Sequence, residues 1–129
     1  MTLSNAMRAS ASGLAAERFR MDVISTNIAN ANSISTPDGE AYRRQFVIFS
    51  GDENGVRIER IVQDLRDLRR EVDPGNPYAD DEGFVYYSNV QPITEMVDMI
   101  GATRSYEANI AAFNSAKGML RSALTIGEV

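Results

Sequence analysis

The 129-residue chain contains no histidine, no cysteine and no tryptophan, and it has a single lysine. Without cysteine the chain can form no disulfide and carry out no thiol redox chemistry, and without histidine or cysteine it lacks the usual ligands of a zinc site. Nucleophilic catalysis by cysteine or by a serine–histidine pair is excluded for the same reason. An enzyme made from this chain would depend on carboxylates, arginine, lysine and tyrosine, and we expect neither a metal nor a cofactor.

Long hydrophobic runs are also missing. The apolar stretches are only a few residues long, far below the ~18 residues needed to span a membrane. The N-terminal sequence Met1-Thr2-Leu3-Ser4 lacks the basic and continuously apolar segments of a cleaved secretory signal. These features predict no direct membrane insertion, and taken by themselves they favour a cytoplasmic location.

Acidic charge is concentrated in the middle of the chain, whose formal net charge is −5. Residues 1–44 carry five basic and four acidic residues, residues 45–92 carry five and ten, and residues 93–129 carry three and four. Because nucleic acid binding needs a concentrated basic face, no nucleic acid partner is expected. The nearly neutral ends are better suited to packing against protein, and the acidic middle to an outer position.

Two long helices are predicted at the ends of the chain, over residues 3–31 and 92–126. The apolar stripe of the first helix repeats every seven positions and consists of Met7, Leu14, Met21 and Ile28. Pro92 suits the first turn of the second helix, with Thr94 or Asn89 as the capping residue. The apolar stripe of the second helix consists of Met96, Met99, Tyr106, Ile110, Phe113, Leu120 and Leu124.

The segment between the helices is predicted to be β-structure. Pro37 and its Asn-, Ser- and Gly-containing neighbours end the first helix in a loop at 33–41. Short apolar or alternating runs predict strands at 46–49, 56–62 and 84–87. Residues 64–72 have helical apolar spacing but are few and highly charged, so helix and strand both remain open. The acidic run 80–83 lacks the spacing of a calcium loop and is interpreted as a solvated turn.

These elements predict an α+β fold in which long N- and C-terminal helices pair as a coiled coil around a small antiparallel β-rich insert. The discontinuous helical domain comprises residues 1–32 and 92–129. Between its two parts lie the loop 33–41 and the β-rich domain 42–91. A β-domain of this size without metal or disulfide has a marginal core. Such helices can cover both faces only by packing against other copies, which indicates an assembly subunit.

Two sequence segments carry a specific resemblance. The first runs from Ser25 to Arg44 and contains Asn27, Ile28, Ala29, Asn30, Thr36, Pro37, Gly39, Tyr42, Arg43 and Arg44. The second lies in the C-terminal part and contains Asn89, Glu95, Met96, Tyr106, Ala108 and Asn109. Both resemble the signatures of the bacterial flagellar rod and hook axial proteins. The spacing in the first segment is similar to that of proximal-rod subunits.

The resemblance implies a structural, non-enzymatic subunit that assembles helically through its terminal helices in the proximal, periplasmic part of the flagellar rod. Such a subunit transmits torque and encloses the export channel. It leaves the cell through the flagellar type III export apparatus without a cleaved signal peptide, which replaces the cytoplasmic location by the basal body. The implied partners are copies of itself, other rod subunits, a base-side adaptor and the membrane ring, with transient contact to the export apparatus.

Under this reading the apolar residues of both helical stripes form the coiled coil and the subunit interfaces. Asn27, Asn30 and Asn32 either satisfy the end of the first helix or bond across subunits. Tyr42, Arg43 and Arg44 pair with acidic residues of an adjacent subunit or begin a solvated strand. Two other functions stay open from the residues alone, namely an export chaperone or adaptor that uses the helix pair as a groove, and a carboxylate enzyme such as a glycosidase.

Overall fold

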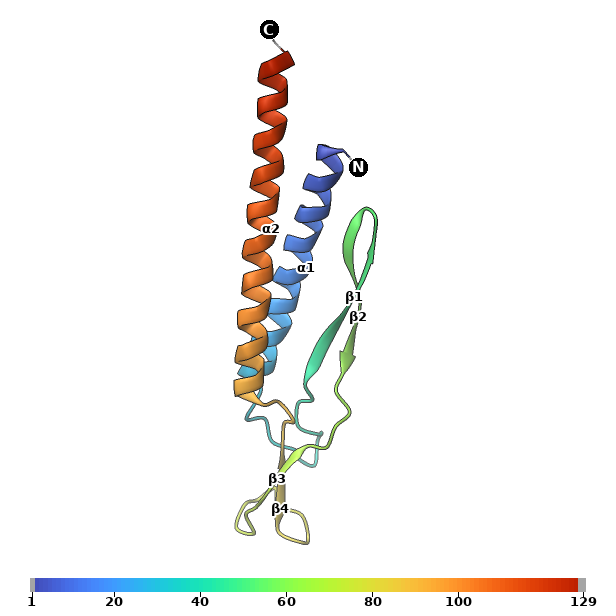
Figure 1. Ribbon diagram of the computed structural model, residues 1–129. Helices are drawn as coiled ribbons and strands as arrows, with labels where there is room; N and C mark the ends of the chain where they lie inside the picture. Colours follow the sequence, from blue (N-terminus) through green and yellow to red (C-terminus); the bar gives the residue numbers. More distant parts are fainter. Residues whose placement is uncertain (1, 128–129) are drawn as a thin grey trace.

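The computed structural model describes residues 2–127 and consists of two long helices that flank a β-rich insert (Figure 1). Helix α1 spans Leu3–Ala29 and helix α2 spans Pro92–Gly127, and the two pack side by side in opposite directions. The strands are β1 (Gln45–Asp52), β2 (Gly55–Gln63), β3 (Arg69–Val72) and β4 (Phe84–Tyr87). The predicted α+β fold is confirmed. Neither helix is long and apolar enough to cross a membrane.

The ends of α1 are defined by polar side chains. The Thr2 hydroxyl accepts a hydrogen bond from the Asn5 amide at 3.1 Å and so caps the first turn. At the other end the Asn30 side-chain amide donates to the Thr26 carbonyl at 2.8 Å, which satisfies one of the free carbonyls of the last turn. Helix α1 therefore ends two residues earlier than the predicted residue 31.

The start of α2 corrects the predicted cap. Pro92 is the first residue of the helix, as predicted. Thr94 lies inside the first turn, where its hydroxyl donates to the Gln91 side chain at 3.2 Å. The Asn89 side chain instead accepts from the Arg44 backbone amide at 2.7 Å. Asn89 therefore serves the contact between the helix and the insert, and neither predicted residue caps α2 by its side chain.

Small residues are among the buried positions of both helices. Gly13 and Ala16 of α1 and Ala102 and Ala116 of α2 are buried. A Cβ atom at Gly13 would lie 2.8 Å from Nδ2 of Asn109 on α2. Glycine in a helix lowers its stability by roughly 1 kcal/mol relative to alanine, and here that loss leaves room for the Asn109 side chain against α1.

The helices keep one register along their length. Gly13 lies opposite Asn109, and Asn27 hydrogen-bonds Glu95 four turns away, so in both pairs the residue numbers add to the same value. Extending that register places Leu3 near residue 119 of α2. The last two turns of α2 therefore project beyond the start of α1 (Figure 1).

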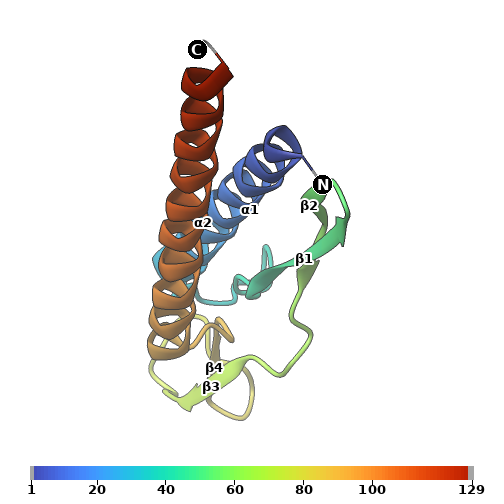
Figure 2. The same cartoon turned by 45° about the horizontal axis from the view of Figure 1, so that its top comes forward.

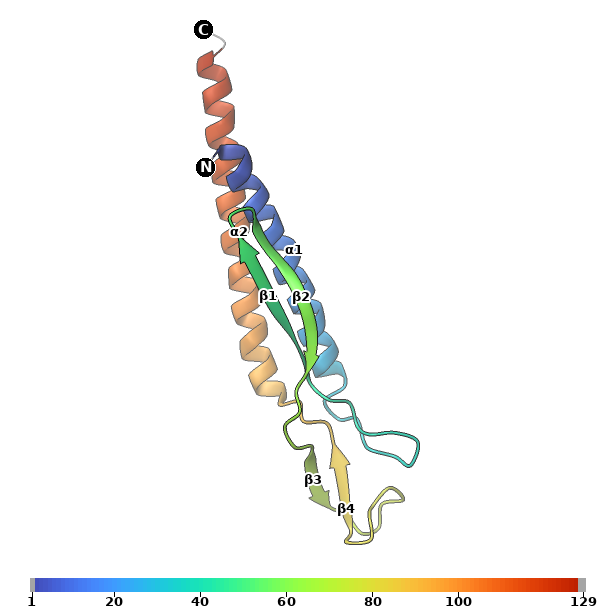
Figure 3. The same ribbon diagram turned by 90° about the vertical axis from the view of Figure 1, so that its right-hand side faces the viewer.

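Strands β1 and β2 form an antiparallel hairpin along α1 (Figure 3), with a bulge between Ile48 and Phe49. Helix α1 lies between this hairpin and α2 (Figure 2). The Val56 amide donates to the Ser12 hydroxyl at 3.0 Å, which holds the tip of the hairpin against the helix. Gly55 has a φ of 135° at this contact, and a Cβ there would lie 2.2 Å from Ser12 Oγ. The contact therefore requires glycine.

Strands β3 and β4 form a second antiparallel hairpin at the far end of the molecule. The undecided segment 64–72 contains no helix, and its last four residues are strand β3. Within the expected loop 33–41, Ile34 forms an antiparallel bridge with Tyr87, and the Ser35 amide donates to the Tyr86 carbonyl at 2.8 Å. This segment therefore contacts β4 through a single isolated bridge and forms no strand of its own.

Candidate assembly surface and polar junction

A buried polar cluster joins the two helices to the insert, and Asn27 lies at its centre. Asn27 and Glu95 are completely buried. The Asn27 side-chain amide donates to Glu95 Oε2 at 3.0 Å and to the Gln45 carbonyl at 2.7 Å. Its Oδ1 accepts from the Gln45 amide at 3.0 Å and from the Tyr42 hydroxyl at 2.7 Å. One side chain thus connects α1, α2 and the start of β1.

Arg44 is the cation of this cluster. Its guanidinium pairs with Glu95, with Asp64 at 3.4 Å and with Asp98 at 3.5 Å, and it lies 5.5 Å from the centre of the Phe46 ring. Burial lowers the pKa of Arg44, but the hydrogen bond to Glu95 and the surrounding carboxylates outweigh burial and leave that pKa raised. A buried carboxylate is tolerated when it is paired and hydrogen-bonded, and Arg44 and Asn27 meet that need for Glu95.

Asp64 and Asn89 close the cluster on the side of the insert. The Asp64 carboxylate accepts from the Arg66 guanidinium at 2.6 Å and from the Arg66 backbone amide at 3.0 Å. The hydrogen bond from the Arg66 side chain is the main reason that the pKa of Asp64 falls to about 2. The Asn89 side-chain amide donates to the carbonyls of Asp64 and Arg66 at 3.0 and 3.1 Å. We call this cluster the polar junction, and its members are Asn27, Tyr42, Arg44, Asp64, Asn89, Glu95 and Asp98.

The polar junction gathers motif residues that the sequence placed at opposite ends of the chain. Arg44 pairs with acidic residues of its own chain, which neither of its two sequence alternatives named. Pairing of Tyr42, Arg43 or Arg44 with an adjacent subunit stays a prediction. Tyr42 donates to Asn27, and burial followed by the charge of Glu95 raises the pKa of its hydroxyl. Asn30 bonds to the end of α1, as one alternative held, whereas Asn27 ties three elements together. The exposed Asn32 lies just beyond the helix.

Sequence reasoning missed Asp64, Asp98 and Gln45 in this cluster. Gln45 contributes only its backbone carbonyl and amide. Its residue type therefore gives no signal for the contact. Asp64 lay in a segment whose secondary structure was undecided. The one sequence feature that points to Asp64 is its position directly after strand β2. There its amide donates to the Arg44 carbonyl beside β1 at 2.7 Å.

The other motif residues form turns and parts of the helix pair. Thr36 and Gly39 exchange backbone hydrogen bonds at 2.8 and 3.1 Å around Pro37, which makes a tight turn. Arg43 pairs with Glu40 three residues earlier at 2.8 Å. Asn109 packs against Gly13 and donates to the Ser105 carbonyl at 3.0 Å. The helix-surface positions are Ile28 and Tyr106, which are half-buried, and Ala29, Met96 and Ala108, which are exposed.

The predicted apolar stripes lie beside the small-residue seam between the helices. On α1 the buried positions are Gly13, Ala16, Glu17, Val23, Ile24 and Asn27. The stripe residues of α1 are half-buried: Met7, Leu14, Met21 and Ile28. On α2 the stripe divides into half-buried Met99, Tyr106 and Phe113 and exposed Met96, Ile110, Leu120 and Leu124. The role of these residues as a subunit interface stays a prediction.

Helix α2 also exposes large apolar side chains beside the predicted stripe, among them Val97 and Ile100, which broaden that stripe in the sequence. The exposed fractions are 78% for Ile93, 62% for Val97 and 57% for Ile100. They lie on the side of α2 that faces away from α1, beside a groove of about 270 Å³. Exposed apolar groups that cluster on one face mark interaction sites in soluble proteins. The face carries the 3.6-residue period of an amphipathic helix, which could have identified it from the sequence.

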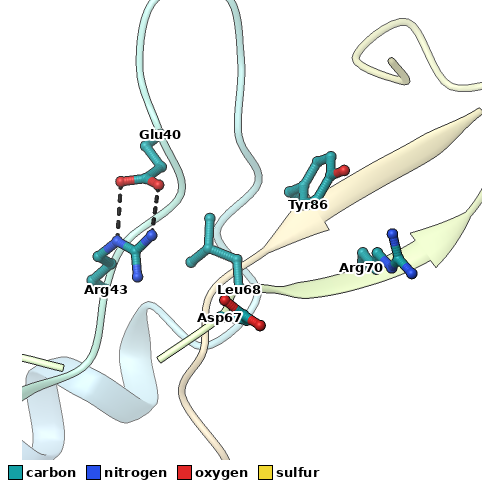
Figure 4. A pocket seen from close by; sticks show the side chains of 6 residues that line it. All are labelled: Glu40, Arg43, Asp67, Leu68, Arg70 and Tyr86. Carbon is teal, nitrogen blue, oxygen red and sulfur yellow. Dashed lines mark hydrogen bonds and ion pairs between the residues drawn. The ribbon is translucent and has the colours of Figure 1, made fainter. Parts of the chain in front are cut away.

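A second hollow lies between the turn after α1 and the β3–β4 hairpin (Figure 4). Its volume is about 420 Å³, and it is lined by Glu40, Arg43, Asp67, Leu68, Arg70 and Tyr86. The Arg43 guanidinium donates to both oxygens of Glu40 and to the Arg66 carbonyl. Its hydrogen bond to Arg43 lowers the pKa of Glu40. The lining carries two arginines, Arg43 and Arg70, and two carboxylates, Glu40 and Asp67, so charges of the two signs are balanced and give a ligand no concentrated charge of one sign.

The acidic turn at 80–83 is organised by its own backbone. Asp80 accepts from the amides of Glu82 and Phe84 at 3.0 and 2.8 Å, and the bond from Phe84 is the main cause of its lowered pKa. Over residues 2–127, no group of three acidic side chains is arranged to hold a metal ion. Asp80 therefore stabilises the turn between β3 and β4.

Comparison with known proteins gives the family. Residues 7–33 match the family model described as flagella basal body rod protein, and residues 81–126 match the model described as flagellar basal body rod FlgEFG protein C-terminal. The flagellar basal-body rod protein FlgC of Bacillus subtilis is 41% identical over 99% of this chain and 100% of its own length. The chain belongs to the FlgC family of flagellar basal-body rod proteins. The FlgC proteins of Borreliella burgdorferi and Salmonella typhimurium are 41% and 37% identical over 98% and 99% of this chain, and 98% and 100% of their own.

Membership of the FlgC family decides among the functions that the residues left open. The chain is a structural subunit of the bacterial flagellar basal-body rod, which is a part of the motility apparatus. The family is non-enzymatic, so the carboxylate enzyme is excluded, and the chaperone or adaptor gives way to the rod subunit. As a rod component, the chain assembles with other rod components. In an FlgC protein the polar junction then has an architectural role.

Proposed function

We propose that the chain is a helically stacked subunit of the proximal part of the rod, in which its terminal helices form the wall around the export channel. The β-rich insert then lies on the outside and the rod transmits torque through the helix contacts. The proposed neighbours are copies of the same chain, other rod subunits, a base-side adaptor and the membrane ring. The chain reaches them through the flagellar type III export apparatus without a cleaved signal peptide.

The observation that supports this proposal is the exposed apolar surface of α2. The apolar residues of α2 that are buried within the chain are the small Ala102 and Ala116, whereas large residues such as Ile100 and Leu124 are more than half exposed. Both lie on a helix that is otherwise well formed. Transferring such side chains out of water contributes roughly 1.5–3 kcal/mol each when they are fully buried. A subunit that buries them against neighbours gains much of its binding free energy from this surface.

The projecting end of α2 offers the sharpest test of assembly. Leu124 lies beyond the start of α1 and is 62% exposed, so replacing it leaves the folded chain intact. We expect Leu124→Glu to abolish swarming in soft agar and to remove the chain from isolated basal bodies, because a buried unpaired carboxylate disrupts an apolar contact. The matched control is Ser122→Glu, which adds the same charge two residues away on a polar position.

The two variants separate assembly from folding. Circular dichroism of the purified variants should give equal helix content for both. Wild-type swarming and normal recovery of Leu124→Glu in basal bodies would contradict the proposed role of the projecting end of α2.

A further inference from the structure

The outer faces of the two helices carry exposed side chains of different size, and each face carries a cation and an anion. At 100° per residue, Ile93, Val97, Ile100, Arg104 and Glu107 fall within about 80° of one another on α2. All five are exposed and face away from α1. We call them the outer face of α2. It presents three large apolar side chains followed by a cation and an anion.

The outer face of α1 has the opposite character. Ala11, Ala15, Arg18, Asp22 and Ala29 fall within about 60° on the helix, and all are exposed. They lie on the side of α1 opposite to its buried residues. This face presents small side chains, together with a cation and an anion. Small positions on one helix accept large side chains from another at close approach.

The charges of the two faces match in a single register. In an antiparallel pairing, Glu107 meets Arg18 when the residue numbers add to 125, and Arg104 meets Asp22 when they add to 126. The register within the chain adds to 122, so both ion pairs form at one offset of three to four residues, or about 5 Å along the axis. The same offset places Val97 opposite Ala29 and Ile100 close to Ser25.

We infer that the outer face of α2 packs against the outer face of α1 of a second copy of this chain that points in the same direction. The contact joins two different surfaces, so each copy offers one face to each of two neighbours and the helices alternate α1, α2, α1, α2 around a wall. An interface of this kind does not close on a pair and propagates along a ring or helix. The inference rests on the proposed function, because it needs copies of the chain side by side in the rod.

The absence of cysteine makes this contact directly testable by cross-linking. The paired variant Val97→Cys with Ala29→Cys places one thiol on each face, in the inferred register. Within one chain these positions face away from each other, so any disulfide joins two copies. In oxidised basal bodies we expect dimers and higher multiples on a non-reducing gel. The matched control is Val97→Cys with Ala15→Cys, which shifts one thiol by about 21 Å on the same face and should stay monomeric.

The outcomes separate the inference from the proposed function. Monomers alone, in basal bodies that contain the cysteine-pair variant, overturn the inferred contact and leave the rod function standing. Dimers from Val97→Cys alone also overturn it, because they require a self-complementary contact. A chain that is absent from basal bodies already in its wild-type form overturns the proposed function itself.

A charge exchange tests the register without cysteine. Arg104→Glu and Asp22→Arg should each reduce swarm diameter at least about twofold, because like charges then face each other across the contact. The double variant restores the ion pair with its direction reversed, and we expect swarming close to that of the wild type. A double variant that swarms no better than the single variants overturns the register.

Discussion

Removal of the Arg44 cation should unfold the polar junction. Arg44→Met keeps much of the side-chain volume but leaves Glu95 completely buried beside Asp64 and Asp98 with no guanidinium. Breaking a buried pair by removing one partner typically costs about 3–5 kcal/mol. For a chain of this size that loss corresponds to a decrease of roughly 10–20 °C in the melting temperature. Urea unfolding of the purified chain, followed by far-ultraviolet circular dichroism, measures the change.

The double variant Arg44→Met with Glu95→Gln provides a second test of the ion pair. Neutralising Glu95 removes the buried charge that Arg44 compensates, so the double variant should be more stable than the sum of the single effects predicts by at least about 1 kcal/mol. The matched control is Arg60→Met, since Arg60 is exposed and pairs only with its neighbour Glu59 at 3.6 Å. That change should stay within about 0.5 kcal/mol. Additive effects, or an Arg44→Met variant as stable as the control, would refute the role of the ion pair.

Two other predictions concern the same chain in solution. The pKa of Asp64 is about 2 in the folded chain, below its ordinary value of 3.8, so its contribution is fully present above pH 4 and is lost as the pH falls towards 2. Because Arg66 is largely exposed, we expect about 1 kcal/mol, and acid titration of Asp64→Asn should lack that step; an unchanged titration would contradict the ion pair. Gly118→Ala should raise the free energy of unfolding by up to about 1 kcal/mol, since nothing lies within 4 Å of its new Cβ. Gly13→Ala should lack that gain, because its Cβ meets the Asn109 side chain, and equal gains at the two sites in urea unfolding would argue against the close helix contact.

The sequence predicts the long helices well because each carries a strong and extended signal. Their ends fall within two residues of the predicted ones, and the three predicted strands are present. The segment 64–72 could not be decided from its own residues. Arg69 and Arg70 form a strand there because the rings of Tyr87 and Phe84 on β4 lie under their guanidinium groups at 4.6 and 4.4 Å, and such contacts depend on a distant part of the chain.

The polar junction, too, could be predicted only in part from the sequence. The motif residues Asn27, Tyr42, Arg44 and Glu95 are recognisable one by one, but the sequence does not predict that they contact one another. Nothing in a sequence distinguishes an acidic partner in the same chain from one in a neighbour. The residues of the helix contact were also hard to predict, because hydrophobic periodicity identifies large apolar side chains and not small ones. The buried positions of α1 also include Gly13 and Ala16, which carry little hydrophobic signal.

The long reach of the polar junction also determines the order in which the chain can fold. Asn27 and Glu95 are 68 positions apart, and Arg44 and Glu95 are 51 apart. The entropy of closing such loops must be overcome before these bonds stabilise anything. Both β-hairpins and the individual helices rely on partners close in sequence, so they can form first. The polar junction and the helix pair therefore form after these local elements, and a chain that is kept extended at either end stays free of its most strongly paired contacts.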